Sequence, residues 1–195
     1  NYFIGIDKSG WHAAEGLIIA RYQMFSQVYF QHTRKAYDKH ISEAIKASLK
    51  YITNNDVFPP PDKEYIQEYL EWDDWKVGGI IKEGKAGSAG EIILNRNHYR
   101  LVYETSEVPD IDELSEFEAI VSHFKDEIGF IDFAEKSWYK KGNDDIPIVE
   151  EKNSKWKPLS EYSSIVKSMA PCKQIRIYVP YEKKDRLREQ IRQFR

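Results

Sequence analysis

Residues 10–37 read GWHAAEGLIIARYQMFSQVYFQHTRKAY. Apolar side chains recur in this stretch at helical spacing, and the spacing continues to about Tyr51 without an intervening proline. The pattern therefore predicts one long helix, or two helices that abut, over residues 11–51. In a chain of 195 residues, such a long helical stretch favours a mainly α-helical fold.

Shorter helices are expected to pack on the long one. Asp62 follows three prolines and is a good N-cap for a helix that carries Trp72 and Trp75. Residues 112–128 form a second amphipathic pattern that ends at Gly129.

The segment between these helices is harder to assign. Residues 84–90, GKAGSAG, predict a flexible loop, and not a phosphate-binding loop, because the Gly-Lys-Ser/Thr order is absent. Residues 91–104 fit a helix or a strand equally well.

The pattern changes near residue 129, where short β-branched runs appear. These predict strands at residues 130–134, 146–149 and 174–179, with helices at residues 159–166 and 182–194. We therefore expect a mainly α fold with a small C-terminal α+β unit. In it, a long helix is packed by shorter helices and is followed by a short mixed sheet with helices. The expected domains are residues 1–128 and residues 129–195.

Composition narrows the functional class. The formal net charge is −3, so no basic excess predicts a nucleic-acid partner. No apolar run approaches the ~20 residues of a membrane span, and the single cysteine, Cys172, favours a cytoplasmic protein with a buried thiol. The first residues lack an initiator Met and read like a strand edge, so we expect a fragment.

The stretch of residues 10–37 resembles the segment that follows the catalytic helices in HD-domain phosphohydrolases related to deoxynucleoside triphosphate triphosphohydrolases. Further pieces resemble the same family in the same order: EWDD at residues 71–74, LNRNHYR at 94–100, LSEYS at 159–163 and RIYVP at 176–180. The resemblance implies that the chain is the C-terminal part of such an enzyme.

The metal site of that family is missing from this sequence. None of the five histidines is followed by Asp, so the resemblance places the divalent metal (Mg, Mn, Zn or Fe) in an upstream part. We expect this chain to hold no catalytic residue, to bind no metal and to be inactive alone. The adjacent carboxylates Asp73 and Asp74 diverge on a helix, and one of them is expected to be structural.

The resemblance also implies substrate-binding residues. Tyr37 matches a tyrosine that contacts the substrate sugar in the family, and Arg34 and Lys35 supply positive charge suited to a triphosphate. Two other readings stay open: a core tyrosine with a satisfied hydroxyl, and a solvated helix face paired with Asp38 and Glu43.

Two further pairs complete the expected sites. Arg21 and Gln27 join the substrate-binding set, although Arg21 could equally pin a neighbouring helix. Arg96 and Arg100 lie four residues apart and would share one helix face. The resemblance implies that this pair binds a regulatory nucleotide at a subunit interface, as the matching pair does in the family.

We therefore expect a (deoxy)nucleoside triphosphate phosphohydrolase, in which this part closes the nucleotide pocket and supports a homo-oligomer, a dimer or tetramer. The alternative is a non-catalytic nucleotide-sensing or protein-assembly module. A nucleic-acid-binding role is the weakest reading, because the chain is acidic overall.

Overall fold

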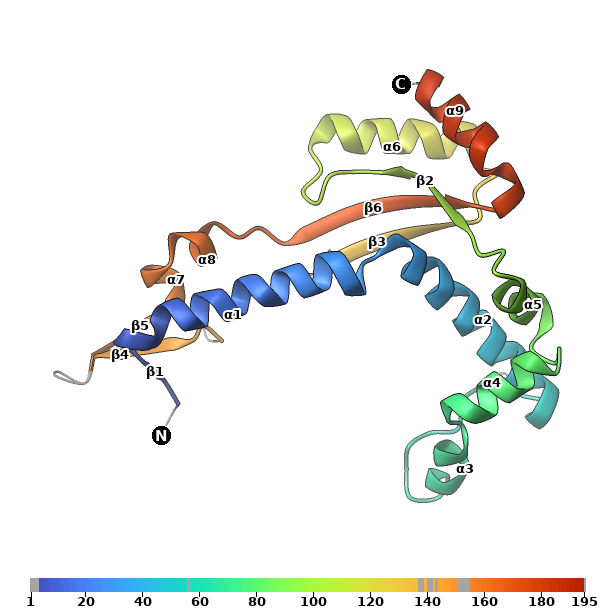
Figure 1. Ribbon diagram of the computed structural model, residues 1–195, viewed down its shortest axis with the longest axis horizontal. Coiled ribbons are helices and arrows are strands. Elements are labelled where there is room, and N and C mark those ends of the chain that lie inside the picture. The colour runs from blue at the N-terminus through green and yellow to red at the C-terminus, as the bar shows by residue number, and fades with distance from the viewer. Residues whose placement is uncertain are drawn as a thin grey trace. The chain divides into compact units, whose positions relative to one another are not determined.

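The computed structural model describes residues 4–55, 57–136, 139, 142, 144–150 and 155–194. The fold is mainly helical, with a small three-stranded mixed sheet and helices near the C-terminal end, as the sequence predicts (Figure 1). No helix in these ranges combines the length and the apolar character that crossing a membrane requires.

Contacts divide the chain into two compact units, each built from three segments. Unit 1 comprises Asn1–Gln31, Glu104–Ala119 and Asp132–Arg176; unit 2 comprises His32–Tyr103, Ile120–Ile131 and Ile177–Arg195. The expected boundary between residues 128 and 129 stays a prediction.

Unit 1 is organised around the mixed sheet. Strand β1 runs parallel to β4, and β4 runs antiparallel to β5. Helix α1 packs its small and branched residues against this sheet's helices, in a core of Ala14, Ile18, Ile148, Leu159 and Val166. The elements of unit 1 are β1 (Ile6–Asp7), η1 (Lys8–Gly10), α1 (Trp11–Met24), η2 (Phe25–Tyr29), β4 (Pro147–Glu150), β5 (Lys155–Pro158), α7 (Leu159–Tyr162) and α8 (Ser164–Ser168).

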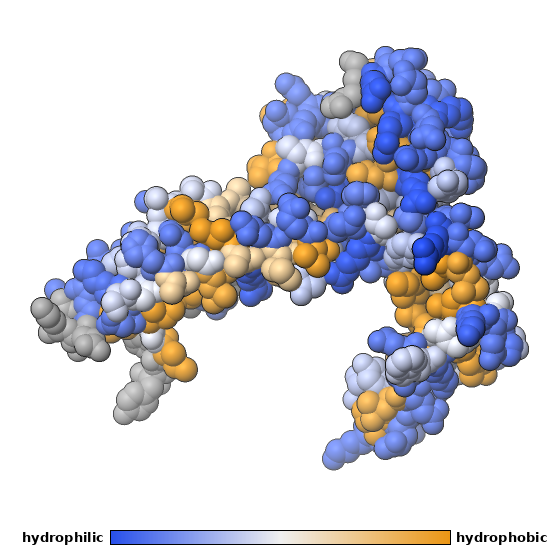
Figure 2. Space-filling model, in the orientation of Figure 1, coloured by the Kyte–Doolittle hydropathy of each residue, from blue (hydrophilic) through white to orange (hydrophobic). Residues whose placement is uncertain are grey.

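Unit 2 is organised around helix α2. Its core consists of Ala44, Leu49, Trp72, Ile80, Ala86 and Ala89. The elements that lie wholly in unit 2 are α2 (His32–Thr53), α3 (Ile66–Glu71), α4 (Asp74–Lys82), α5 (Gly87–Asn95), η3 (Tyr181–Lys183) and α9 (Lys184–Phe194). Figure 2 shows apolar side chains gathered at the surface over α2, α4 and α5.

A second three-stranded sheet and one helix contribute residues to both units. The sheet has the order β2-β6-β3, and backbone hydrogen bonds from Thr105 to Ile175 and from Lys173 to Glu107 continue an antiparallel ladder beyond β2. These elements are β2 (Arg100–Glu104), α6 (Ile111–Phe124), β3 (Phe130–Lys136) and β6 (Cys172–Val179).

The long helical stretch forms as two helices, which is one of the two alternatives that the sequence allowed. After α1 comes the π-helical turn η2, in which Phe30 N donates to Phe25 O at 2.8 Å, and α2 begins at His32. The helical spacing across Phe30 and Gln31 is therefore not one continuous face.

The helix expected after Asp62 is also divided. Asp62 accepts hydrogen bonds from the backbone of Glu64 and Tyr65, each at 3.2 Å, so it closes a turn before α3. Helix α4 has its own N-cap, because Asp73 accepts from Lys76 N at 2.8 Å. The structural reading of one of the two carboxylates fits this arrangement.

Two expectations for the middle of the chain need correction. The predicted loop over residues 84–90 is too long, because α5 begins at Gly87 and buries Gly90 against Ala86. Residues 91–104 hold both a helix and a strand, since α5 ends at Asn95 and β2 begins at Arg100.

Candidate functional site

Two of the residues that the sequence singled out, Tyr37 and Arg100, meet in unit 2. Together with His98 and Tyr181 they form what we call the Tyr37 cluster. The ring of Tyr37, on α2, lies 4.4 Å from the ring of His98. Nη1 of Arg100 donates to the His98 imidazole and lies 3.2 Å from Nδ1. The Arg100 guanidinium also lies 4.8 Å from the centre of the Tyr181 ring, a cation–π contact.

A second row of rings supports the segment that carries His98. The His40 ring stacks on Tyr99 at 4.5 Å, and Tyr99 N donates to His40 Nε2 at 3.2 Å. Tyr99 then contacts Phe130, which stacks on Tyr178 at 4.3 Å. Since these rings are largely buried and interlocked, they fix the approach of residues 98–100 to α2.

Burial keeps both histidines neutral at neutral pH. Desolvation lowers the pKa of His98, and the nearby Arg100 charge lowers it further. Desolvation is also the main cause that lowers the pKa of His40. A neutral His98 can accept the hydrogen bond from Arg100, and a neutral His40 can accept the one from Tyr99.

The Tyr37 cluster combines one fixed cation with three ring faces. Arg100 is half-buried, so its guanidinium is held in place while still reaching solvent. A guanidinium of this kind suits phosphate or carboxylate groups, and aromatic faces suit a base or a sugar. The arrangement can therefore hold an anionic ligand that carries a ring.

The other predicted cations differ in their surroundings. Arg34 is exposed and lies 3.9 Å from Asp38, and Lys39 pairs with Glu43 at 2.9 Å, which are the contacts of a solvated helix face. Lys35 is half-buried on the same helix.

Arg21 and Gln27 belong to unit 1. The Arg21 guanidinium lies 5.5 Å from the centre of the Phe25 ring, and Gln27 is exposed within the π-helical turn.

The pair Arg96 and Arg100 does not share a helix face, so the expected geometry is wrong. Arg96 is the C-cap of α5, in the left-handed region with φ 57°, and Arg100 is the first residue of β2. The two remain neighbours, because Arg100 Nη2 donates to Arg96 O at 3.4 Å.

Sequence reasoning missed the residues that join Tyr37 to Arg100. His98 lies inside the LNRNHYR stretch, where its spacing to Tyr37 follows no local pattern, and Tyr181 carries no signal beyond following Pro180. Within the ranges that the structure describes, no three His, Cys, Asp or Glu side chains are grouped as a metal centre requires.

Residues 3–194 match the family described as the HD associated region. The chain belongs to this family. No curated protein matches it.

Solved structures similar to the HD-associated region include a hypothetical protein from Aquifex aeolicus, which is 26% identical with a TM-score of 0.75. That alignment covers 96% of this chain and 47% of the Aquifex chain. A phosphohydrolase from Bacteroides thetaiotaomicron VPI-5482 is 17% identical with a TM-score of 0.61, over 90% of this chain and 51% of that one. This HD-associated region therefore spans about half the length of the solved structures that it resembles.

Proposed function

We propose that this HD-associated region is the C-terminal part of a metal-dependent HD-superfamily phosphohydrolase that acts on (deoxy)nucleoside triphosphates. Its family and the phosphohydrolase among its structural neighbours support a hydrolase context. The observation that carries the nucleotide assignment is the Tyr37 cluster, where a fixed guanidinium lies among aromatic faces.

In this proposal the chain closes the nucleotide pocket. Tyr37 contacts the sugar, and Arg34 and Lys35 face the phosphates, where positive charge stabilises a triphosphate. Arg21 and Gln27 belong to unit 1, and their part in substrate binding rests on the family resemblance alone. The sequence assigned both Arg96 and Arg100 to a regulatory nucleotide. Because Arg100 lies in the Tyr37 cluster, we assign it to the substrate and only Arg96 to the regulatory site. The chain supports a dimer or tetramer.

The divalent metal belongs to the proposed upstream part. The described residues of this chain offer no grouped ligands for it. When bound, such a metal would activate a water molecule against a phosphate ester. The contribution of this chain is to position the nucleotide, and the chain alone is expected to be inactive.

The test is phosphate or triphosphate release from the four dNTPs by the parent protein, with Mn²⁺ or Mg²⁺. Tyr37→Ala should lower kcat/KM about tenfold or more, because a sugar contact is lost. Tyr51→Ala is the matched control, since Tyr51 lies on the same helix, is 60% exposed and is outside the Tyr37 cluster. Equal values of kcat/KM for both variants would mean that Tyr37 only packs and does not contact the substrate.

The regulatory assignment is tested separately. If the parent protein is activated by dGTP, Arg96→Ala should abolish the activation and leave the basal rate intact. Activation that survives would contradict the assignment of Arg96. No turnover with either metal would favour the alternative, a nucleotide-sensing or assembly module.

A further inference from the structure

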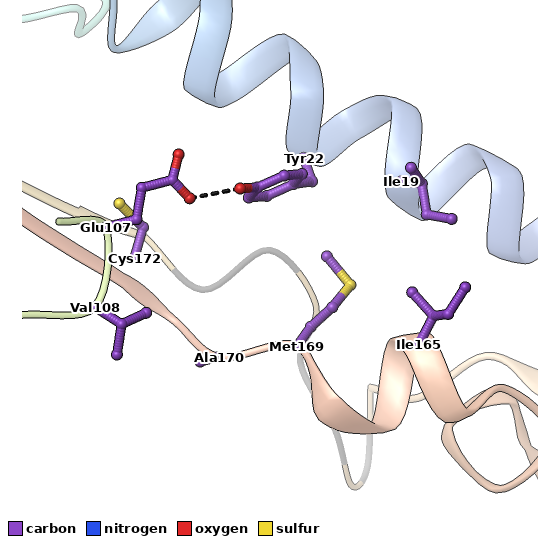
Figure 3. Close-up of a pocket in the computed structure, with 8 residues that line it drawn as sticks. All are labelled: Ile19, Tyr22, Glu107, Val108, Ile165, Met169, Ala170 and Cys172. Carbon is purple, nitrogen blue, oxygen red and sulfur yellow. Dashed lines mark hydrogen bonds between the residues drawn. The ribbon is translucent and has the colours of Figure 1, made fainter.

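Unit 1 contains a cavity of about 340 Å³ that the proposed function does not use (Figure 3). Its walls come from α1, from α8 with the segment that follows it, and from the segment after β2. Ile19, Ile165, Met169 and Val108 make one part of the lining apolar. The volume lies at the lower end of the range for small-molecule sites, roughly 300–1,000 Å³.

The polar part of the lining is the pair of Tyr22 and Glu107. The Tyr22 hydroxyl donates to Glu107 Oε2 at 2.5 Å, as the dashed line in Figure 3 marks. This hydrogen bond is the main cause that raises the pKa of Tyr22 to about 12, so the phenol stays protonated and remains the donor.

The Glu107 carboxylate keeps acceptor capacity for a ligand. Its second oxygen, Oε1, accepts no hydrogen bond from any residue that the structure describes. The backbone beneath it is fixed, because Lys173 N donates to Glu107 O at 2.8 Å. An ionised carboxylate accepts and never donates, so it requires a donor from whatever enters the cavity.

We propose that this cavity binds a small organic cation with a compact apolar body, whose protonated amine donates to Glu107. The apolar lining takes up the body, since removing apolar surface from water is favourable. The carboxylate supplies the opposite charge and would repel a polyanion such as a nucleotide. The cavity shares no lining residue with the Tyr37 cluster, and the proposal does not require the hydrolase activity.

The two methionines of the chain make a direct test possible. Met169 lines the cavity, whereas Met24 is 47% exposed on α1 and does not line it. With ¹³C-methyl methionine, titration with cyclohexylmethylamine should shift the Met169 resonance saturably and leave that of Met24 in place. Cyclohexanecarboxylate, an anion with a similar body, should shift neither.

Glu107→Gln tests the role of the charge. It keeps the size of the side chain and should weaken cyclohexylmethylamine binding about tenfold, the loss expected for one charge-assisted hydrogen bond. Glu118→Gln is the control, because Glu118 is exposed on α6 and outside the cavity lining. This variant should bind cyclohexylmethylamine with the affinity of wild type.

A second variant covers the case in which Glu107→Gln fails to fold. Tyr22→Phe keeps the ring and frees Glu107 Oε2, so amine binding should be retained or strengthened. Three results would overturn the proposal: equal binding of the amine and the carboxylate, equal shifts of both methionines, or an amine affinity of folded Glu107→Gln equal to that of wild type. Each would mean adventitious binding only.

Discussion

Arg176 is a buried cation whose donors are all directed to acceptors within unit 1. The residue is 6% exposed, and its Nε lies 3.2 Å from Glu104. Nη1 donates to Phe30 O, and Nη2 donates to Gln174 Oε1 at 2.5 Å. Phe30 follows the π-helical turn, so Arg176 binds a carbonyl that lies at the break between α1 and α2.

Replacing Arg176 by Met should lower the free energy of unfolding by about 2–3 kcal/mol, because the Phe30 carbonyl and the Glu104 carboxylate each lose a charged donor. The alkyl stem is kept, so packing changes little. Urea unfolding followed by circular dichroism measures the loss. Arg176→Lys should recover part of it; a Met variant as stable as wild type would mean that water replaces the guanidinium.

His40 makes stability depend on pH. Its pKa is lowered on folding because it is buried, so below about pH 6.5 the unfolded chain binds more protons than the folded chain. The free energy of unfolding should therefore fall as the pH drops from about 7 to about 5.5. Protonation would also remove the acceptor that Nε2 offers to Tyr99 N.

His40→Gln should reduce this pH dependence, because an amide oxygen can accept from Tyr99 N without titrating. The measurement is urea unfolding of wild type and variant at about pH 7 and about pH 5.5. His98, whose pKa is lowered in the same direction, should leave some dependence in the variant. If the free energy of unfolding of His40→Gln depends on pH as strongly as that of wild type, other titratable groups cause the whole pH dependence.

At the scale of elements, helix α4 depends on its own cap. Asp73 accepts from Lys76 N, so Asp73→Ala should destabilise the protein by about 1 kcal/mol. Asp74 is the matched control, since it is exposed in the first turn of α4. Asp74→Ala should change stability by no more than about 0.5 kcal/mol. Thermal unfolding of the two variants separates them; equal losses would remove the cap assignment.

Gly129 allows the turn before β3 to approach Tyr99 closely. A Cβ at this position would lie 2.6 Å from Tyr99 Cε1, and the ring is held between His40 and Phe130. Gly129→Ala should therefore cost about 1–3 kcal/mol in urea unfolding. Gly16→Ala, in α1 with open space around the added Cβ, should instead stabilise by about 0.5–1 kcal/mol. A neutral Gly129 variant would show that Tyr99 can move.

The sequence predicted most helices and the longer strands because apolar periodicity is dictated by burial. It did not place the break after η2, since no proline or glycine marks Phe30, and the carbonyl there is satisfied by Arg176 from a distant segment. The strand β5 was missed because its residues, KWKP, are mostly exposed and charged. Such features depend on tertiary partners that local patterns do not encode.

At the scale of the whole molecule, the candidate site could be predicted only in part. Tyr37 and Arg100 were each singled out, but they were assigned to separate nucleotide sites. Their common neighbour His98 becomes visible only when the segment before β2 packs against Tyr37 of α2, because contacts between segments far apart in the sequence leave no spacing rule. Trp72 and Trp75 were also treated alike, yet Trp72 is 9% exposed in the core and Trp75 is 88% exposed.

Trp75 is the residue through which we expect unit 2 to associate with a second copy. A tryptophan is rarely so exposed in a monomer, and Leu70, on the preceding helix, is 61% exposed. Trp75→Glu should weaken self-association of the chain at least about tenfold, because a charge replaces a buried aromatic anchor at the interface. Sedimentation velocity over a concentration series measures this change.

Leu17→Glu provides the control for Trp75→Glu. Leu17 lies on α1 in unit 1 and is 66% exposed, so the substitution adds the same charge at a comparable apolar site. Its association should match that of wild type. If Leu17→Glu dissociates the oligomer and Trp75→Glu does not, the interface lies on unit 1. If neither variant changes sedimentation, Trp75 does not lie in an interface between copies of this chain. That result would contradict a role of unit 2 in assembly.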